Sequence, residues 1–109
     1  MSSNLTVTRG DTLSLVIGIN NADGTKYELQ EGDILTFSVK KTTKIDAPIL
    51  IQKTMNLQTG TICELTPDDT NLPYGKYKYD VELRQASGTV VTIIKPSTLV
   101  ITEEVTTHE

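Results

Sequence analysis

The segment Tyr77-Lys78-Tyr79-Asp80-Val81-Glu82-Leu83-Arg84 alternates apolar and polar side chains without a break. Successive side chains of a β-strand point to opposite faces, so this pattern predicts a strand with one buried and one solvated face. Thr, Val and Ile supply 18, 8 and 10 residues of the chain and Ala only 3, which disfavours a helical bundle because β-branched side chains lose rotamer freedom in helices.

Shorter segments with the same alternation recur along the chain and are separated by turn residues. We predict seven to nine strands, in or around residues 5–7, 13–19, 27–29, 35–40, 49–55, 62–66, 77–84, 89–95 and 99–105. Thr66, Pro67 and the following acids predict one short helical turn near 67–72. The pattern therefore favours an all-β fold, a sandwich or a small barrel, without crossover helices.

Length and charge narrow the class of protein. We expect a single domain spanning residues 1–109, with an ordered core of about 4–105. The net charge of −4 and pI of about 4.9 argue against nucleic acid as a partner, because phosphate binding needs basic surface. No apolar run is long enough to cross a membrane, and the N-terminus has no secretory pattern. The single cysteine cannot form an internal disulfide and suits a reducing cytosol.

No residues are predicted to be catalytic, cofactor-binding or metal-binding, so we expect no enzyme and no cofactor. His108 lies at the C-terminal tail, where nothing holds a catalytic base in place. Cys63 lies in an alternating strand without a partner base and is predicted to be a small core or interface residue. Asp68, Asp69 and Asp80 could suggest a cation site, but helix capping explains the first two better.

Two surface motifs have simple structural explanations. Arg9-Gly10-Asp11 matches a tripeptide that some cell-surface receptors bind, yet it is also an ordinary turn before a strand. Tyr27 and Tyr74 are the two rings expected at the surface, and they give a weak signal for carbohydrate binding.

The segment from Lys41 to Met55 is the predicted interface. Its consecutive residues Ile49, Leu50 and Ile51 place apolar side chains on both faces of a strand. One of those faces must meet a partner or be covered by a loop. We therefore predict an edge strand whose partner-binding residues are Ile49, Leu50 and Ile51.

The order Leu72, Gly75 and Tyr77 at the entry to a late strand resembles the tyrosine corner of immunoglobulin-like and fibronectin-like sandwiches. The resemblance implies an immunoglobulin-like two-sheet antiparallel β-sandwich. It also implies that the Tyr77 ring packs under the crossover loop and that its hydroxyl group bonds back to the backbone.

A longer ordered set of segments covers roughly residues 5 to 105. It comprises Arg9-Gly10-Asp11-Thr12, Gly32-Asp33 before Leu35-Thr36-Phe37-Ser38-Val39-Lys40, Leu65-Thr66-Pro67-Asp68-Asp69-Thr70, Gly75-Lys76-Tyr77-Lys78-Tyr79-Asp80-Val81 and Thr89-Val90-Val91-Thr92. This set resembles the small immunoglobulin-like domain of phage and prophage tail proteins. It is similar to the N-terminal domain of the baseplate upper protein of phages that infect Gram-positive bacteria.

That resemblance implies a non-enzymatic structural module of a virion tail or baseplate, assembled in the cytoplasm of the bacterial host. Its partners would be other virion proteins, with self-association left open, and neither nucleic acid nor a membrane. The alternative is a small carbohydrate-binding β-sandwich module. A small hydrolase has less support, because no nucleophile, base and orienting group can be assembled from the sequence.

Overall fold

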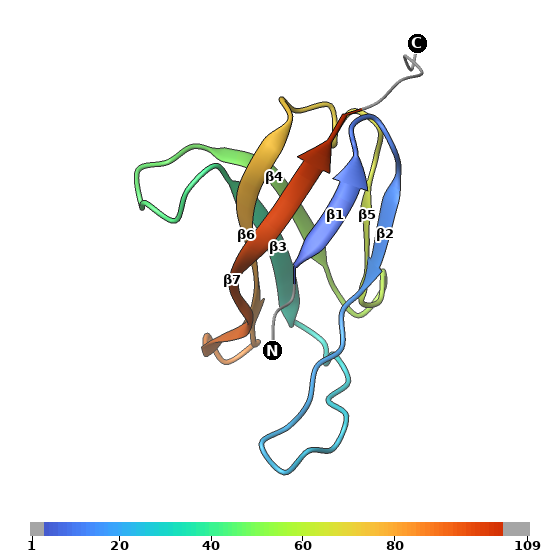
Figure 1. Ribbon diagram of the computed structural model, residues 1–109. Coiled ribbons are helices and arrows are strands. Elements are labelled where there is room, and N and C mark those ends of the chain that lie inside the picture. The colour runs from blue at the N-terminus through green and yellow to red at the C-terminus, as the bar shows by residue number, and fades with distance from the viewer. Residues whose placement is uncertain (1–3, 104–109) are drawn as a thin grey trace.

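The computed structural model describes residues 4–103, which form seven strands and no helix (Figure 1). None of these residues belongs to a helix that could cross a membrane. The strands are β1 (Leu5–Thr8), β2 (Leu13–Val16), β3 (Ile34–Lys40), β4 (Ile49–Met55), β5 (Ile62–Leu65), β6 (Gly75–Arg84) and β7 (Val90–Thr102). The all-β prediction is confirmed for this part of the chain.

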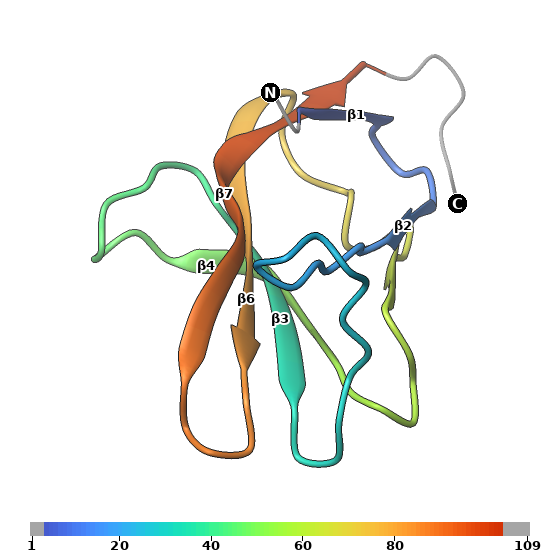
Figure 2. The same ribbon diagram turned by 90° about the horizontal axis from the view of Figure 1, so that it is seen from below.

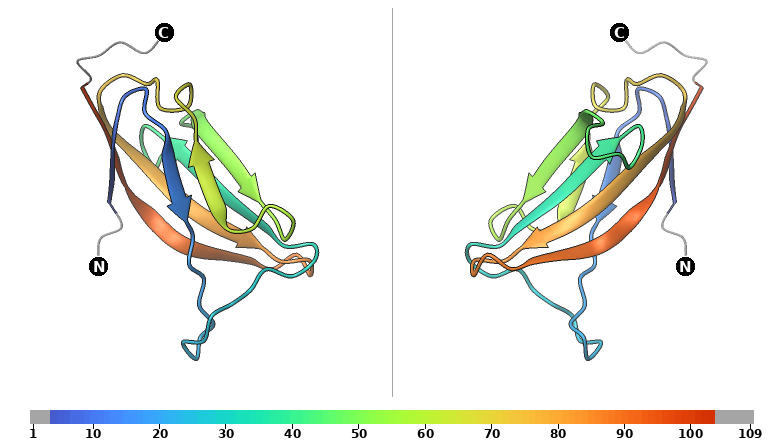
Figure 3. Two further views of the ribbon diagram at one scale, coloured as in Figure 1. Left: turned by 90° about the vertical axis from the view of Figure 1, so that its right-hand side faces the viewer. Right: turned by 90° about the vertical axis from the view of Figure 1, so that its left-hand side faces the viewer.

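The strands form two sheets, as a sandwich requires. The larger sheet has the order β1-β7-β6-β3-β4, and β2 and β5 form the smaller one. The larger sheet curls around the shared core, with β1 at one border and β4 at the other (Figure 2). Figure 3 shows β2 and β5 as the layer that lies against its concave side.

One prediction about strand direction is wrong. β1 pairs with β7 in parallel, with Leu5 opposite Leu99 and Val7 opposite Ile101, whereas the other strand pairs are antiparallel. Antiparallel pairing is required only where a short turn joins two strands. Nearly the whole domain separates β1 from β7, so no hairpin dictates their relative direction.

The last two predicted strands, around residues 89–95 and 99–105, form one continuous strand, β7. β7 runs through Pro96, and its register against β6 shifts between Tyr79 and Val81 and again between Val81 and Glu82. Pro cannot donate a ladder hydrogen bond and is tolerated in a strand at a bulge. Val105, the predicted end of this strand, lies outside the described residues, as does His108.

One further predicted element differs from the structure. The segment around Tyr27 and Leu29 is a loop, in which Asn20 and Lys26 make an isolated bridge. Near the predicted short helical turn, residues 67–70 form a turn closed by a hydrogen bond from Thr70 N to the Thr66 carbonyl oxygen (3.2 Å), which does not continue as a helix.

The inward faces of both sheets form one core. Phe37, Val39, Val81 and Leu65 are fully buried, and the rings of Phe37 and Tyr79 lie 5.4 Å apart. The alternating residues of β6 behave as predicted, since the exposed fractions of its four apolar side chains are 3% or less: Tyr77, Tyr79, Val81 and Leu83. The outward face of β6 carries charged side chains, and several of them line the hollows described in the next subsection.

Candidate functional site

The predicted interface residues lie on β4, at one end of the larger sheet. Lys40 pairs with Ile49 and Val39 pairs with Ile51, so Leu50 is an extra residue in a β-bulge. Paired residues point to the same side of a sheet. Ile49 therefore shares the outer face with Lys40, while Ile51 shares the core with Val39.

The three residues thus have different exposure. Ile49 and Leu50 are 51% and 41% exposed, whereas Ile51 is 4% exposed. The bulge explains how Ile49 and Ile51, two residues apart, point to opposite faces of one strand. Ile51 belongs to the core, and only Ile49 and Leu50 remain on the surface.

The loop between β3 and β4, residues 41–48, stands out from the body of the domain (Figures 1 and 2). Ile45 near its tip is 97% exposed. The Lys40 ammonium group donates to the carbonyl oxygens of Lys44 (3.5 Å) and Ile45 (3.4 Å), and Ala47 N donates to Lys44 O (3.1 Å). These bonds hold the backbone and leave the Ile45 side chain in solvent.

Lysines surround the base of this loop. Lys40 on β3 lies directly opposite Lys78 on β6, and both face outward. Like charges directly opposite each other in a sheet are destabilising. Lys41 lies over the Tyr77 ring at 4.4 Å from its centroid and donates to the carbonyl oxygen of Lys76 (3.1 Å). With Lys44 in the loop, five lysines gather at this corner of a chain whose net charge is −4.

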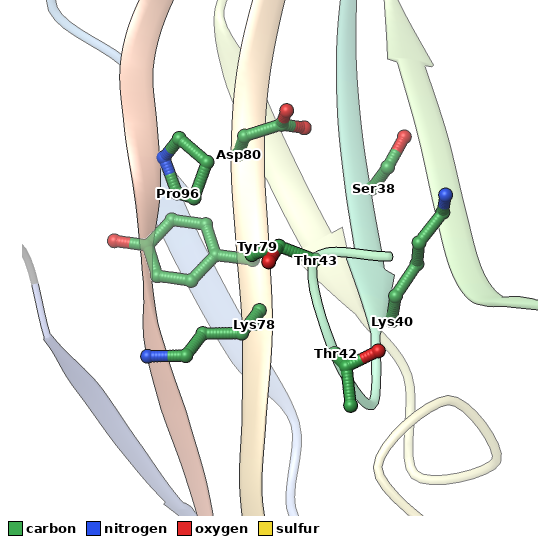
Figure 4. Close-up of a pocket in the computed structure, with 8 residues that line it drawn as sticks. All are labelled: Ser38, Lys40, Thr42, Thr43, Lys78, Tyr79, Asp80 and Pro96. Carbon is green, nitrogen blue, oxygen red and sulfur yellow. The ribbon is translucent and has the colours of Figure 1, made fainter. Parts of the chain in front are cut away.

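A small cavity lies between these elements on the outer face of the sheet (Figure 4). Its volume is about 120 Å³, well below the roughly 300–1,000 Å³ of typical ligand pockets. Figure 4 shows the side chains of Lys40 and Lys78 pointing away from each other. The lining residues are Ser38, Lys40, Thr42, Thr43, Lys78, Tyr79, Asp80 and Pro96.

A larger hollow of about 450 Å³ continues along the same face. Ligand pockets are lined mainly by hydrophobic and aromatic side chains, whereas this hollow is lined mainly by polar and charged ones. The lining residues are Ile34, Thr36, Ser38, Lys40, Ile49, Gln52, Asp80, Glu82 and Arg84. Its composition fits a wet contact surface better than a small-molecule site.

The residues considered for catalysis and metal binding are held in structural roles. Cys63 is 1% exposed, and burial raises the pKa of its thiol to about 11. The Asp69 carboxylate accepts hydrogen bonds from Thr66 N (2.8 Å) and Thr66 Oγ1 (3.0 Å) and pairs with Lys53 (2.7 Å). The Thr66 hydroxyl accepts in return from Asp69 N (3.3 Å), which is the reciprocal pattern of a capping box.

Within residues 4–103 no three His, Cys, Asp or Glu side chains gather as metal ligands would. Asp80 lies on the outer face of β6 and lines both hollows of the sheet.

The two candidate tyrosines cannot form one stacking platform. Tyr74 is 46% exposed and precedes the first residue of β6, while Tyr27 contacts Gln85, just beyond the last. A strand of this length spans roughly 33 Å. The Arg9 guanidinium also lies 5.5 Å from the centroid of the Tyr74 ring and donates to Asn71 Oδ1 (3.0 Å), so Arg9 is held within its turn.

Asp33 is a buried carboxylate that the sequence pattern did not single out. It accepts hydrogen bonds from the Tyr27 hydroxyl, Gln30 N (2.9 Å) and Ala86 N (3.3 Å). These bonds, with Tyr27 first, hold the pKa of the Asp33 carboxyl below its usual value. They join the β2–β3 loop to the β6–β7 turn, so Asp33 has a structural role. The Gly32-Asp33 pair before a strand was the available signal, and it indicated only a turn.

No protein-family model matches the chain, and no curated protein is detectably similar to it.

Proposed function

We propose that the protein is an immunoglobulin-like docking module of a phage or prophage tail or baseplate, which acts through protein–protein contacts and catalyses no reaction. It would be assembled in the cytoplasm of the bacterial host and reside in the virion. The observation that carries this proposal is the exposure of three apolar side chains on an edge strand and the loop that leads into it: Ile45, Ile49 and Leu50. Clustered apolar exposure marks interaction surfaces.

The topology supports the immunoglobulin-like part of the proposal. The first strand pairs in parallel with the last at one border of the larger sheet, and β2 and β5 form the second layer. The Tyr77 hydroxyl donates to the carbonyl oxygen of Pro73 (2.5 Å), four residues upstream. A tyrosine corner makes this kind of bond from a Tyr near the start of a late strand.

Mass spectrometry of purified particles tests the function. Virions or tails are prepared from the strain that encodes the chain, and the peptides are quantified against the major tail proteins. We expect the chain at a fixed ratio to those proteins through successive density gradients. Its absence from intact particles would refute the proposal. A glycan array with the isolated protein serves as the test of the carbohydrate-binding alternative, for which we expect no binding.

A further inference from the structure

The smaller sheet has an unpaired border along β2. In the part of the chain that the structure describes, β2 pairs on one side only, with β5. Ile17 N donates to the carbonyl oxygen of Thr61 (2.9 Å), which continues this ladder by one residue pair. Residues of an antiparallel ladder alternate between facing the partner strand and facing away from it. The backbone N–H and C=O groups of Ser14, Val16 and Gly18 therefore face the open side.

This border lacks the features that keep exposed strands from pairing with other chains. Residues 12–22 contain no charged side chain and no proline. In contrast, β4 has its bulge and carries Lys53 opposite Phe37, on the core side of the strand. The part of β7 that extends beyond β1 contains Lys95 and Pro96. Charges, prolines and bulges are the usual protection of sheet edges, so β2 is left open to a further strand.

Exposed apolar groups lie on both sides of this border. On the outer face, Val16 is 78% exposed and pairs with Ile62, which is 58% exposed. On the inner side, an open groove of about 200 Å³ lies between β2 and the strands β1 and β7. Its lining is mainly apolar and includes Leu15, Ile17 and Ile94. A strand added beside β2 would cover apolar groups on both of these sides.

We propose that this border binds the same border of a second copy of the chain, with the two β2 strands antiparallel about a two-fold axis at Val16. In this register Val16 exchanges both of its backbone hydrogen bonds with its counterpart, and Ser14 pairs with Gly18 of the second copy. The smaller sheets of the two copies become one continuous sheet. This surface lies on the other side of the domain from the loop 41–48, so the inference goes beyond the proposed function (Figure 2).

The side chains of this segment are complementary to themselves in that register. On the outer face, Val16 and Ile62 form one continuous apolar row with their counterparts, because directly opposite residues are in contact. On the inner side, Leu15 lies opposite Ile17 of the second copy, so each chain covers part of the other's groove. Asp11 precedes the segment, and its two copies lie at opposite ends of the contact, where they do not repel. A self-complementary patch of this kind closes as a two-fold dimer.

Sedimentation velocity of the full chain over a range of concentrations tests the proposal. We expect an equilibrium between monomer and dimer that high salt does not weaken, because no charge pair holds the contact. A monomer at every concentration would overturn the proposal and would leave the border to a different protein. Species that grow beyond the dimer would also overturn it, since a two-fold contact is closed.

A matched pair of substitutions locates the contact. Val16→Lys should lower the association constant about tenfold or more, because it places two ammonium groups opposite each other. Val90→Lys makes the same change in net charge at a 48% exposed position of β7 and should leave the association constant unchanged. Equal weakening by both substitutions would refute the role of β2. Thermal unfolding of both variants verifies the fold.

Disulfide formation tests the register. Val16→Cys places each new thiol opposite its counterpart, with Cα atoms about 5.5 Å apart, within the range that a disulfide spans. Ser14→Cys is the control, because in this register its counterpart is displaced by roughly 13 Å along the strand. Mild oxidation should therefore link the Val16→Cys chains into dimers and leave the Ser14→Cys chains unlinked. The wild type, whose Cys63 is 1% exposed, gives the background. Equal linking of the two variants, or no linking of Val16→Cys, would disprove the proposed pairing.

Discussion

The hydroxyl group of Tyr77 donates a hydrogen bond of 2.5 Å to the carbonyl oxygen of Pro73, and it does so from a ring whose residue is only 3% exposed. This bond ties the start of β6 to the end of the loop that arrives from β5. The Lys41 ammonium group lies over the same ring, 4.4 Å from its centroid. Tyr77 thus connects the core to the lysines at the base of the β3–β4 loop.

Removal of this hydroxyl should destabilise the domain. We expect Tyr77→Phe to lower the free energy of unfolding by about 0.5–1.5 kcal/mol, the usual net contribution of one hydrogen bond. Chemical denaturation followed by circular dichroism measures the change. Tyr74→Phe, which removes the hydroxyl of a 46% exposed ring, should have an effect within about 0.5 kcal/mol of zero. Equal effects of the two variants would contradict the role of the Tyr77 bond.

Asp33 should make stability depend on pH in the acid range. Its folded-state pKa is lowered, first by the Tyr27 hydrogen bond, so its contribution is full above the unfolded value near 3.8 and is lost as the pH falls through the folded value. Asp33→Asn should cost about 1–3 kcal/mol at neutral pH, because it weakens three hydrogen bonds to a buried group.

The difference in stability between wild type and Asp33→Asn should therefore shrink as the pH falls below 3.8. Denaturation curves at a series of pH values give that difference. Asp46→Asn, in the exposed β3–β4 loop, is the control and should leave stability unchanged within about 0.5 kcal/mol. A constant difference for Asp33→Asn at all pH values would disprove the assignment.

Gly32 is required for two separable reasons. Its φ of 88° lies in the left-handed region, and a Cβ atom there would meet Ala86 Cβ at 2.7 Å. Gly60 has a φ of 76° but open space around the same position. Gly60→Ala should cost about 1 kcal/mol from backbone strain alone, and Gly32→Ala should cost clearly more. Adding Ala86→Gly to Gly32→Ala should recover only the loss of stability that the steric clash causes. Chemical denaturation of the wild type, Gly60→Ala, Gly32→Ala and the double variant separates backbone strain from the clash.

Leu50 and Ile51 should respond differently to the same substitution. Leu50→Lys should leave the monomer folded and weaken assembly, because Leu50 is 41% exposed in the bulge. Ile51→Lys places an unpaired charge in the core and should cost more than about 3 kcal/mol, a range reached by core disruption. Thermal unfolding and sedimentation together distinguish the outcomes. An unfolded Leu50→Lys monomer would mean that Leu50 belongs to the core and would remove it from the interface.

The Cys63 thiol should be nearly unreactive in the folded protein. Its residue is 1% exposed and burial raises the thiol pKa to about 11, so little thiolate is present at neutral pH and reagents have poor access to it. Under native conditions, a maleimide or disulfide reagent should modify Cys63 no faster than the domain unfolds locally or globally. In denaturant the same reagent should modify it readily. Fast modification under native conditions would contradict the burial of this side chain.

The sequence by itself determined where the chain is extended and which face of each strand is buried. The alternation from Tyr77 to Leu83 is a local property, because the pleat of any strand sends successive side chains to opposite sides. The same logic located β4 and its apolar run and predicted a core or interface position for Cys63, and the structure shows that it is a core residue. Tyr77 was also identified from its local pattern, and its bond to the Pro73 carbonyl is present.

Only the tertiary structure decided which strands pair and where the pairing is interrupted. Four features depend on which segments meet across the fold: the parallel contact of β1 with β7, the bulge at Leu50, the continuation of β7 through Pro96 and the capture of two loops by Asp33. Period-two alternation carries no information about the neighbour across a ladder or about one extra residue within it. The proposed interface therefore depends on how β4 pairs with β3, since the bulge alone directs Ile49 outward and Ile51 inward.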